Sequence, residues 1–378
     1  MTFKTRLLPT AFILVLVLHF VDELFEWIPE PPVAEQRKRT EKPTFNINHL
    51  DPFPKDFEPY YNDHFKWKNF FVQAHNYLNY YTFKKSALPE QVVVGKNGWL
   101  FKGGHQLDVH RGKFQLTEKE LQQTVQEILR RKNEIEAMGA KFYLSIAPLK
   151  ANIYPENLPD NTVPLNPTTY TQQLIHAIQE EGITYIDLFD LMASLKEEQL
   201  LYLKTDHHWN NFASKSAAEY ILKRIRQDFP SLPAVDLKDF RTEQVEYDGM
   251  SLAQMIGMEE VLKDTFVILH GKENKQITAL SHNYPIPHDF PFKEEYIVKT
   301  KTEGSELPKV MVARESFATP FTTIFPHYFS ETIFLFDNWK HDFHPNIIQQ
   351  EQPDIYLHLI WEGLLFQMIK PDKNDIHW

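Results

Sequence analysis

The sequence contains no cysteine among its 378 residues. Disulfide bridges, thiolate metal ligands and cysteine nucleophiles are therefore excluded, although this absence does not identify a cellular compartment. An excess of basic residues is also absent, because 40 Lys and Arg stand against 51 Asp and Glu, for a net charge of −11. Such a charge disfavours binding to phosphate backbones, so we expect no nucleic-acid partner. The 42% of hydrophobic residues supplies ample material for a globular core.

The N-terminus lacks the run of about 20 apolar residues that an ordinary membrane-spanning helix needs. It has a shorter apolar run from Leu7 to Val21, preceded by Lys4 and Arg6 and followed by acidic residues. This charge bias predicts a cytoplasmic N-terminus and places the rest of the chain outside the membrane. No small-residue cleavage site follows the run. We therefore expect residues 1–28 to be a signal anchor that is retained in the mature protein. A cleaved signal peptide and a buried helix of a cytosolic protein are the alternatives.

The composition then divides the remaining chain into a tether and one large domain. Residues 29–58 are rich in proline and charge, which predicts a tether. Residues 59–378 form the expected domain. At its start, aromatic and apolar residues recur at helical spacing from Phe65 to Tyr81, which predicts an amphipathic helix that packs into the core.

Strand and helix signals alternate through the domain. Asn97-Gly98 between apolar runs predicts a hairpin, and Thr117 with Glu120 forms a capping-box pair at a helix start. The predicted helices cover 116–138, 170–181 and 211–229, and the predicted strands cover 141–147, 183–188, 310–313, 332–336 and 355–360. This alternation indicates an α/β fold with a parallel sheet covered by helices on both faces. Residues 236–304 break the rhythm and are expected to be an insertion with its own strands at 266–269 and 296–301.

One short motif, Thr205-Asp-His-His-Trp209, combines an acid with imidazoles directly ahead of a helix. In an extended or turn segment, residues i and i+2 lie on the same side, so Asp206 is expected to pair with His208. His207 is then expected to be structural and Trp209 to pack the segment down. The alternative is that Asp206 only caps the helix that begins near Asn210.

A serine follows the apolar strand that ends near residue 313. Ser316 lies between this strand and a segment, 317–325, that can form a helix. That arrangement predicts a nucleophile at the carboxyl edge of the sheet, with backbone N–H groups available to an oxyanion. The surrounding residues do not match the Gly-x-Ser-x-Gly motif of α/β-hydrolases. The alternative is a serine that only caps the helix.

The histidines also permit a metal interpretation. Asp206, His207 and His208 could be joined by His341 and His344, which have a spacing that can chelate an ion. We favour an Asp–His–Ser arrangement without metal, because a hydroxyl becomes nucleophilic when an oriented base takes its proton.

Three blocks of sequence resemble a known family in order and spacing: 94–101, 147–159 and 205–210. They are similar to the SGNH hydrolase-like domain of bacterial alginate O-acetyltransferases of the AlgX/AlgJ type, including the proteins called DHHW. The similarity runs from about residue 60 to 365 and implies an SGNH-like, flavodoxin-like fold. No appended sugar-binding module is apparent, so we expect the single-domain AlgJ type. Glu315 departs from the aspartate or glycine that is more usual ahead of the family's nucleophile.

The resemblance implies roles for individual residues. Ser316 would carry a covalent acetyl group, His208 would act as general base and then acid, and Asp206 would orient His208. Lys150 and Arg314 are candidates for contact with the substrate. No second oxyanion donor is assigned, and no metal or cofactor is expected.

The resemblance also implies an activity and a location. We expect an extracytoplasmic enzyme, anchored to the cytoplasmic membrane, that moves acetyl groups onto hydroxyls of a cell-surface or exported polysaccharide. A multispanning membrane O-acyltransferase would supply the acetyl group. Two alternatives stay open: an acetyl esterase with the same triad, and a non-catalytic anchored protein that binds or assembles polysaccharide.

Overall fold

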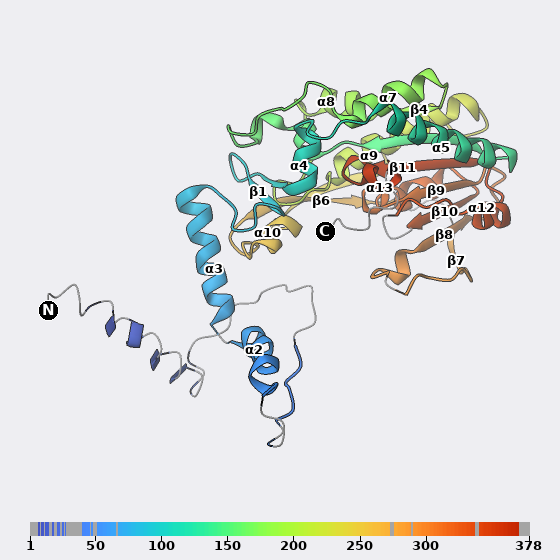
Figure 1. Ribbon diagram of the computed structural model, residues 1–378. Helices are drawn as coiled ribbons and strands as arrows, with labels where there is room; N and C mark the ends of the chain where they lie inside the picture. Colours follow the sequence, from blue (N-terminus) through green and yellow to red (C-terminus); the bar gives the residue numbers. More distant parts are fainter. Residues whose placement is uncertain are drawn as a thin grey trace.

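The computed structural model describes most of the chain between residues 51 and 369 (Figure 1). Residues 66, 273–275, 289, 337–339 and 370–378 are outside the description, and before residue 51 it covers only 7, 9–10, 12–14, 17–18, 21–22, 25, 27, 40–45 and 47. Part of the anchor expected at residues 1–28 therefore lies outside the described residues, and the anchor stays a prediction. No helix of the described residues is long and apolar enough to cross a membrane.

A seven-stranded sheet forms the centre of the domain, in the order β4-β3-β11-β9-β10-β8-β7. The strands are β3 (Lys141–Ala147), β4 (Tyr185–Ile186), β7 (Ile277–Leu280), β8 (Ile297–Thr302), β9 (Val310–Arg314), β10 (Glu331–Phe336) and β11 (Ile355–Trp361). The first five in spatial order are parallel, as the sequence predicts. The other two, β8 and β7, come from the insertion and extend the sheet antiparallel, so the sheet is mixed.

The register of the central strands brings their carboxyl ends to one edge. Trp361 at the end of β11 pairs with Ala147 at the end of β3, and His358 of β11 pairs with Ala313 of β9. Every residue of β9 and of β11 is buried. Strands that are buried on both faces read as continuous apolar runs, which is why the sequence reveals them.

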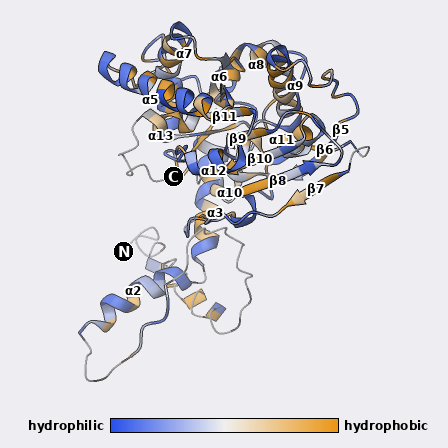
Figure 2. Cartoon of the chain, turned by 90° about the vertical axis from the view of Figure 1, so that its right-hand side faces the viewer, coloured by the Kyte–Doolittle hydropathy of each residue, from blue (hydrophilic) through white to orange (hydrophobic). Residues whose placement is uncertain are grey.

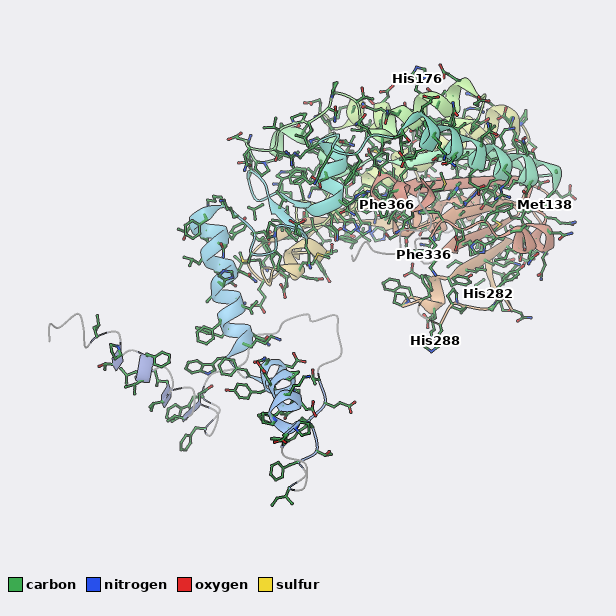
Figure 3. All side chains as sticks on the ribbon, in the orientation of Figure 1. Met138, His176, His282, His288, Phe336 and Phe366 are labelled. Carbon is green, nitrogen blue, oxygen red and sulfur yellow. The ribbon has the colours of Figure 1, made fainter. Side chains whose placement is uncertain are left out.

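Helices cover the sheet on both sides. They are α4 (Gly104–His110), α5 (Glu118–Ala137), α6 (Lys150–Ile153), α7 (Tyr170–Glu180), α8 (Phe189–Leu195), α9 (Asn211–Asp228), α11 (Phe321–Ile324), α12 (Pro345–Glu351) and α13 (Leu365–Ile369). In Figure 2, α5 and α7 lie on one side of the central strands and α9 and α11 on the other. Thr117 forms the expected capping box with Glu120 at the start of α5. Figure 3 shows His176 at the periphery of this body and Phe366 within it.

Two small antiparallel units lie beside the main sheet. One is the hairpin β1 (Val92–Val94) and β2 (Leu100–Lys102), in which Asn97 and Gly98 both have positive φ, as the expected turn requires. The other, from the insertion, pairs β5 (Arg241–Asp248) with β6 (Lys263–His270) and carries α10 (Ser251–Met255) between them. Side chains of α10 and of the hairpin share a second hydrophobic cluster. The insertion is therefore packed against the body.

The N-terminal helices differ from the expectation. They are α2 (Phe53–His64) and α3 (Lys68–Leu78), which continues as a π-helical turn over Asn79–Phe83. Figure 1 shows α3 projecting away from the body. Phe70, Phe71 and Tyr81 are about half exposed, at 47%, 45% and 52%. Core packing is therefore the wrong interpretation for these aromatics, because α3 contacts the body mainly near its end, where Asn76 donates to the carbonyl of Ile256.

Candidate active site

The Asp-His-His segment forms a tight loop that is closed by backbone pairing. An isolated antiparallel bridge joins Tyr202 to Trp209, and α9 begins two residues later. The side chain of Asn210 caps this helix by accepting from the N–H groups of Phe212 and Ala213. The alternative in which Asp206 is the helix cap is therefore wrong. Trp209 is buried, as expected, and its indole N–H donates to the Phe317 carbonyl at 3.0 Å.

Asp206 is buried and accepts hydrogen bonds at both of its oxygens. Its Oδ1 lies 2.7 Å from His208 Nδ1 and accepts from the His208 backbone N–H at 2.9 Å. Its Oδ2 accepts from the backbone N–H of Ser251 at 3.1 Å. Burial alone would raise the pKa of Asp206, but the hydrogen bonds and the neighbouring imidazoles hold it well below its ordinary value. Asp206 is therefore a carboxylate that holds His208 through Nδ1.

The other nitrogen of His208 meets the expected nucleophile. His208 Nε2 lies 2.8 Å from Ser316 Oγ, although 108 residues separate the two in the chain. Ser316 lies two residues after the end of β9, at the edge where the parallel strands end. With its proton on Nδ1, facing the carboxylate, the imidazole presents a lone pair on Nε2 to the serine hydroxyl. These distances are those that a serine nucleophile and an oriented general base require.

The segment after Ser316 is not the continuous helix that the sequence suggests. It contains a 3-10 turn over Ser316–Ala318, the four-residue α11 and a second 3-10 turn over Phe325–His327. Pro320 and Pro326 explain the interruptions, because proline lacks the N–H that would continue a helical hydrogen-bond ladder. A long helix dipole aimed at the serine is therefore absent from the described residues.

Glu315 caps this turn. Its Oε2 accepts from the Phe317 backbone N–H at 2.8 Å, so the alternative in which Ser316 is the cap is wrong. The backbone N–H of Ser316 itself is not engaged by any described residue. It is therefore the donor best placed to meet an oxyanion that forms on an acyl group at Oγ.

Glu315 is also the residue whose importance sequence reasoning understated. Ser316 Oγ lies 3.3 Å from its Oε2, and its Oε1 is buried with no hydrogen-bond partner among the described residues. Burial raises the pKa of Glu315 to about 7, against the lowering effect of the Phe317 N–H and His208. A buried acid therefore contacts the serine as well as the histidine does. Its position directly before the expected nucleophile was the available signal.

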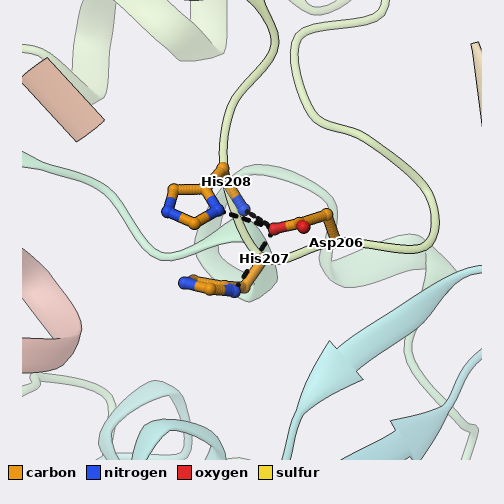
Figure 4. A group of neighbouring side chains, drawn as sticks. All are labelled: Asp206, His207 and His208. Atoms are coloured by element: carbon orange, nitrogen blue, oxygen red, sulfur yellow. Dashed lines mark hydrogen bonds and ion pairs between the residues drawn. The ribbon is translucent and has the colours of Figure 1, made fainter. Parts of the chain in front are cut away.

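His207 lies closer to Asp206 than the alternation argument suggests. Its ring packs against His208 with centroids 3.9 Å apart, and its Nδ1 is 3.3 Å from Asp206 Oδ1 (Figure 4). The segment bends rather than extends, so neighbouring side chains are not forced to opposite sides. Burial lowers the pKa of His207 well below its ordinary value, which keeps its ring neutral. On its other side the ring packs against Trp361, with centroids 5.1 Å apart.

Of the five residues proposed as metal ligands, three lie close together in the structure. Asp206, His207 and His208 offer ligand atoms that all lie within 4.8 Å of one another, and no other such group exists in the described part of the chain. His341 does not join them; its Nδ1 lies 3.1 Å from Nε2 of His358 on β11. In the observed arrangement, both His208 nitrogens are already directed at Asp206 and Ser316.

The two residues expected to contact substrate are both buried. Lys150 is 4% exposed, and its Nζ donates to backbone carbonyls of the hairpin and of the Asp206 loop. Arg314 is 1% exposed, donates to Thr319 Oγ1 at 2.8 Å and stacks on Phe336 at 4.8 Å. Their contact with substrate stays a prediction. In this structure both cations instead brace the loops that carry the acid and the serine.

Comparison with known proteins supports the resemblance seen in the motifs. Residues 92–265 match the family described as "SGNH hydrolase-like domain, acetyltransferase AlgX". The "Probable alginate O-acetylase AlgJ" of Pseudomonas syringae pv. tomato is 27% identical over 176 residues, which are 47% of this chain and 43% of that protein. The protein of the same name from Pseudomonas aeruginosa is 28% identical over 172 residues, 45% of this chain and 42% of its own length. The match therefore spans less than half of each relative.

Solved structures show the same fold. Bacillus cereus PatB1 with a sulfonyl adduct superposes with a TM-score of 0.54 at 16% identity, covering 74% of this chain and 97% of that one. A DHHW family protein from Eubacterium siraeum superposes with a TM-score of 0.52 at 16% identity, covering 74% and 98%. The resemblance to the AlgX/AlgJ-type SGNH hydrolase-like domain is confirmed, and the fold is SGNH-like.

Proposed function

We propose that this SGNH hydrolase-like chain is an extracytoplasmic O-acetyltransferase that acts through Ser316, His208 and Asp206. The observation that carries the proposal is the continuous hydrogen-bond path from Ser316 Oγ to His208 Nε2 at 2.8 Å and from His208 Nδ1 to Asp206 Oδ1 at 2.7 Å. The relatives named as probable alginate O-acetylases support acetyl as the transferred group and a polysaccharide hydroxyl as its acceptor.

The first half of the reaction loads the serine. His208 Nε2 takes the proton from Ser316 Oγ while Oγ attacks the carbonyl carbon of an acetyl donor. The negative charge that develops on the carbonyl oxygen is stabilised by the Ser316 N–H, and Asp206 stabilises the imidazolium. When the tetrahedral intermediate collapses, the bond to the donor's leaving group breaks. His208 returns the proton to that group, and an acetyl ester stays on Ser316.

In the second half of the reaction, the acceptor hydroxyl is the nucleophile and Ser316 Oγ is the leaving group. A sugar hydroxyl gives its proton to His208 Nε2 and attacks the acetyl carbonyl. Collapse of the second tetrahedral intermediate breaks the bond to Oγ, which regains its proton from His208. If water replaces the sugar hydroxyl, the same steps hydrolyse the ester, and the protein is a carbohydrate acetyl esterase. The continuous hydrogen-bond path between the three side chains favours both enzymes over a non-catalytic binding protein.

The donor, membrane and location belong to the same proposal. An N-terminal anchor would hold the domain outside the cytoplasmic membrane, where exported polysaccharide is accessible. A multispanning membrane O-acyltransferase would bring the acetyl group to that side. The charge pattern around the apolar run from Leu7 to Val21 supports this arrangement.

An acetyl-transfer assay separates the candidate functions. The full chain is incubated with a surrogate acetyl ester and a panel of glycans, and both acetylated glycan and free acetate are measured by mass spectrometry. A transferase yields acetylated glycan at the expense of acetate. Acetate alone, at a rate that no glycan alters, would identify the esterase, and neither product would identify the binding protein.

A further inference from the structure

Lys150 is a buried ammonium that is surrounded by backbone oxygens rather than by carboxylates. It opens α6, three residues after the end of β3. Its Nζ donates to four carbonyl oxygens, those of Leu100 at 2.7 Å, Leu203 at 2.6 Å, Lys204 at 2.8 Å and Asp206 at 2.9 Å. An ammonium has three hydrogens, so these acceptors share them. The arrangement resembles a small cation held by a shell of carbonyl oxygens.

Contacts of the neighbouring residues and of two aromatic rings fix the position of Lys150. The Leu149 N–H, next to it, donates to the buried carboxylate of Glu362 at 2.8 Å, just beyond the end of β11. Tyr202 OH donates to the Pro148 carbonyl at 2.7 Å. The aromatic faces of Trp99 and Phe101 lie 4.8 and 5.1 Å from Nζ and favour its charge. Lys150 is therefore a fixed point from which the loop can be positioned.

The loop that carries Asp206 is hydrogen-bonded to Lys150 and to the insertion through its backbone. Of the four consecutive carbonyls from residue 203 to residue 206, Lys150 takes those of 203, 204 and 206. The remaining one, on Thr205, accepts from the N–H groups of Leu252 and Ala253 in α10. From the insertion, Asp264 accepts from the Thr205 N–H at 2.6 Å. The loop is thus clamped between Lys150 and the insertion.

We propose that Lys150 is a positioning residue of the active site, whose ammonium holds the 203–206 backbone so that Asp206 meets His208. The inference rests on the proposed function. It assigns Lys150 to the support of Asp206 instead of to contact with the substrate. Burial lowers the pKa of Lys150 to about 7, while the carboxylates of Asp264 and Asp206 act in the opposite direction. Without the ammonium, the carbonyls of residues 203 and 206 lose their donor, while that of residue 204 keeps the Leu100 N–H at 2.8 Å, and the loop must shift to find water.

The test compares Lys150→Met with a matched lysine. Methionine keeps an unbranched apolar stem and removes every donor. Lys196 is the control, because its Nζ also donates to a backbone carbonyl, that of Ile153 at 2.9 Å, but does not contact the Asp206 loop. Turnover of p-nitrophenyl acetate by the full chain is measured per folded molecule, with the folded fraction taken from near-ultraviolet circular dichroism and unfolding curves.

A shift of about 1 Å in a catalytic group costs roughly 100-fold in rate. Lys150→Met should therefore lower kcat by about that factor with KM within twofold, and Lys196→Met should leave both within twofold. The downfield proton NMR signal of a His208 Nδ1–H bonded to Asp206 should be lost in Lys150→Met alone. A substrate contact would instead raise KM and preserve the signal. An unchanged kcat with the signal retained overturns the proposal.

Two further variants keep the outcome decisive. If Lys150→Met does not fold, Lys150→Arg is measured in the same way. Its planar guanidinium keeps the charge but cannot converge on these carbonyls, so kcat should still fall, and a normal kcat overturns the proposal. Ser316→Ala is run in parallel. If Ser316→Ala keeps its activity, the proposed function fails; if it is inactive while the Lys150 variants are normal, only the role of Lys150 fails.

Discussion

Three adjacent residues, Arg314, Glu315 and Ser316, illustrate how hydrogen-bond partners assign roles that residue types alone leave open. Arg314 is buried and braces Thr319, Glu315 takes the Phe317 N–H, and Ser316 is left to face His208. A serine that follows a strand is most simply explained as a cap. Here the glutamate caps the turn, and the serine hydroxyl instead lies 2.8 Å from His208 Nε2 and 3.3 Å from Glu315 Oε2, so a capping role does not explain its position.

Ser316→Ala should therefore abolish turnover without harming the fold. Members of a triad act as a unit, so we expect a loss on the order of 10⁴ to 10⁶ in kcat and an unchanged unfolding transition. Intact-mass spectrometry after brief exposure to an activated acetyl ester should show one acetyl adduct on the wild-type protein and none on the variant. An adduct that persists in folded Ser316→Ala, with activity retained, would show that another residue is the nucleophile.

Substitutions of the two neighbouring histidines should differ in their effect on turnover in the same assay. His208→Ala removes the base that contacts Ser316 Oγ and should eliminate most turnover. His207→Ala should mainly lower stability, because its ring packs between His208 and Trp361 without reaching the serine. The metal interpretation makes the opposite forecast, in which both variants and a chelator abolish activity together. Inactivation by chelator that added zinc reverses would exclude the triad.

Glu315 should leave a signature in the pH dependence of stability. Its folded pKa is raised from 4.5 to about 7, so the neutral acid is favoured in the folded state. Its stabilising contribution is full below pH about 4.5 and is lost as the pH rises through about 7. Glutamine stays neutral, so the free energy of unfolding of the wild type relative to Glu315→Gln should fall by about 3 kcal/mol across that window. Urea unfolding of both proteins at several pH values tests this, and parallel curves would contradict it.

The elements that sequence reasoning finds are those with local signals. The capping box at Thr117 and the Asn97-Gly98 turn each depend on residues a few positions apart, and both form as predicted. The buried strands show up as apolar runs. The antiparallel edge of the sheet was not predicted, because the pairing of β8 with β10 depends on long-range contacts that no local pattern encodes.

In the candidate site as well, contacts between residues close in sequence could be predicted and those between distant residues were harder to predict. The pairing of Asp206 with His208 follows from a spacing of two residues and could be predicted. The contact between His208 and Ser316 joins residues 108 positions apart in the chain. The sequence suggested it through a serine that follows a strand, and the family resemblance implied it, but the family match over residues 92–265 does not reach the serine. The hydrogen bonds from Lys150 to residues 203–206 could not be predicted from the sequence, because their acceptors are backbone carbonyls, which every residue has.

At the scale of the whole molecule, the site depends on parts of the chain that are distant in sequence. The parallel strands deliver the serine, α10 and β6 of the insertion secure the acid, and the hairpin closes over Lys150. The insertion is therefore part of the candidate site rather than a peripheral addition. Outside this body, Trp67 at the start of α3 donates to the carboxylate of Asp22 at 2.7 Å, which links the helical extension to the residue that follows the apolar run of the expected anchor.

The charges around the apolar run also predict the orientation of the anchor in the membrane. Lys4 and Arg6 precede the apolar run and acidic residues follow it, so the positive-inside rule places everything after Val21 outside the cytoplasm. A reporter that is active only in the cytoplasm, fused after Trp378, should therefore be silent, and one that is active only outside should give a signal. Reversing the charges, with Lys4 and Arg6 changed to Glu and basic residues placed after Val21, should weaken or invert both readings because the flanking cations set the orientation. A cytoplasmic signal from the unaltered fusion would place Ser316 on the side where exported polysaccharide is absent, and would contradict the acceptor as well as the anchor.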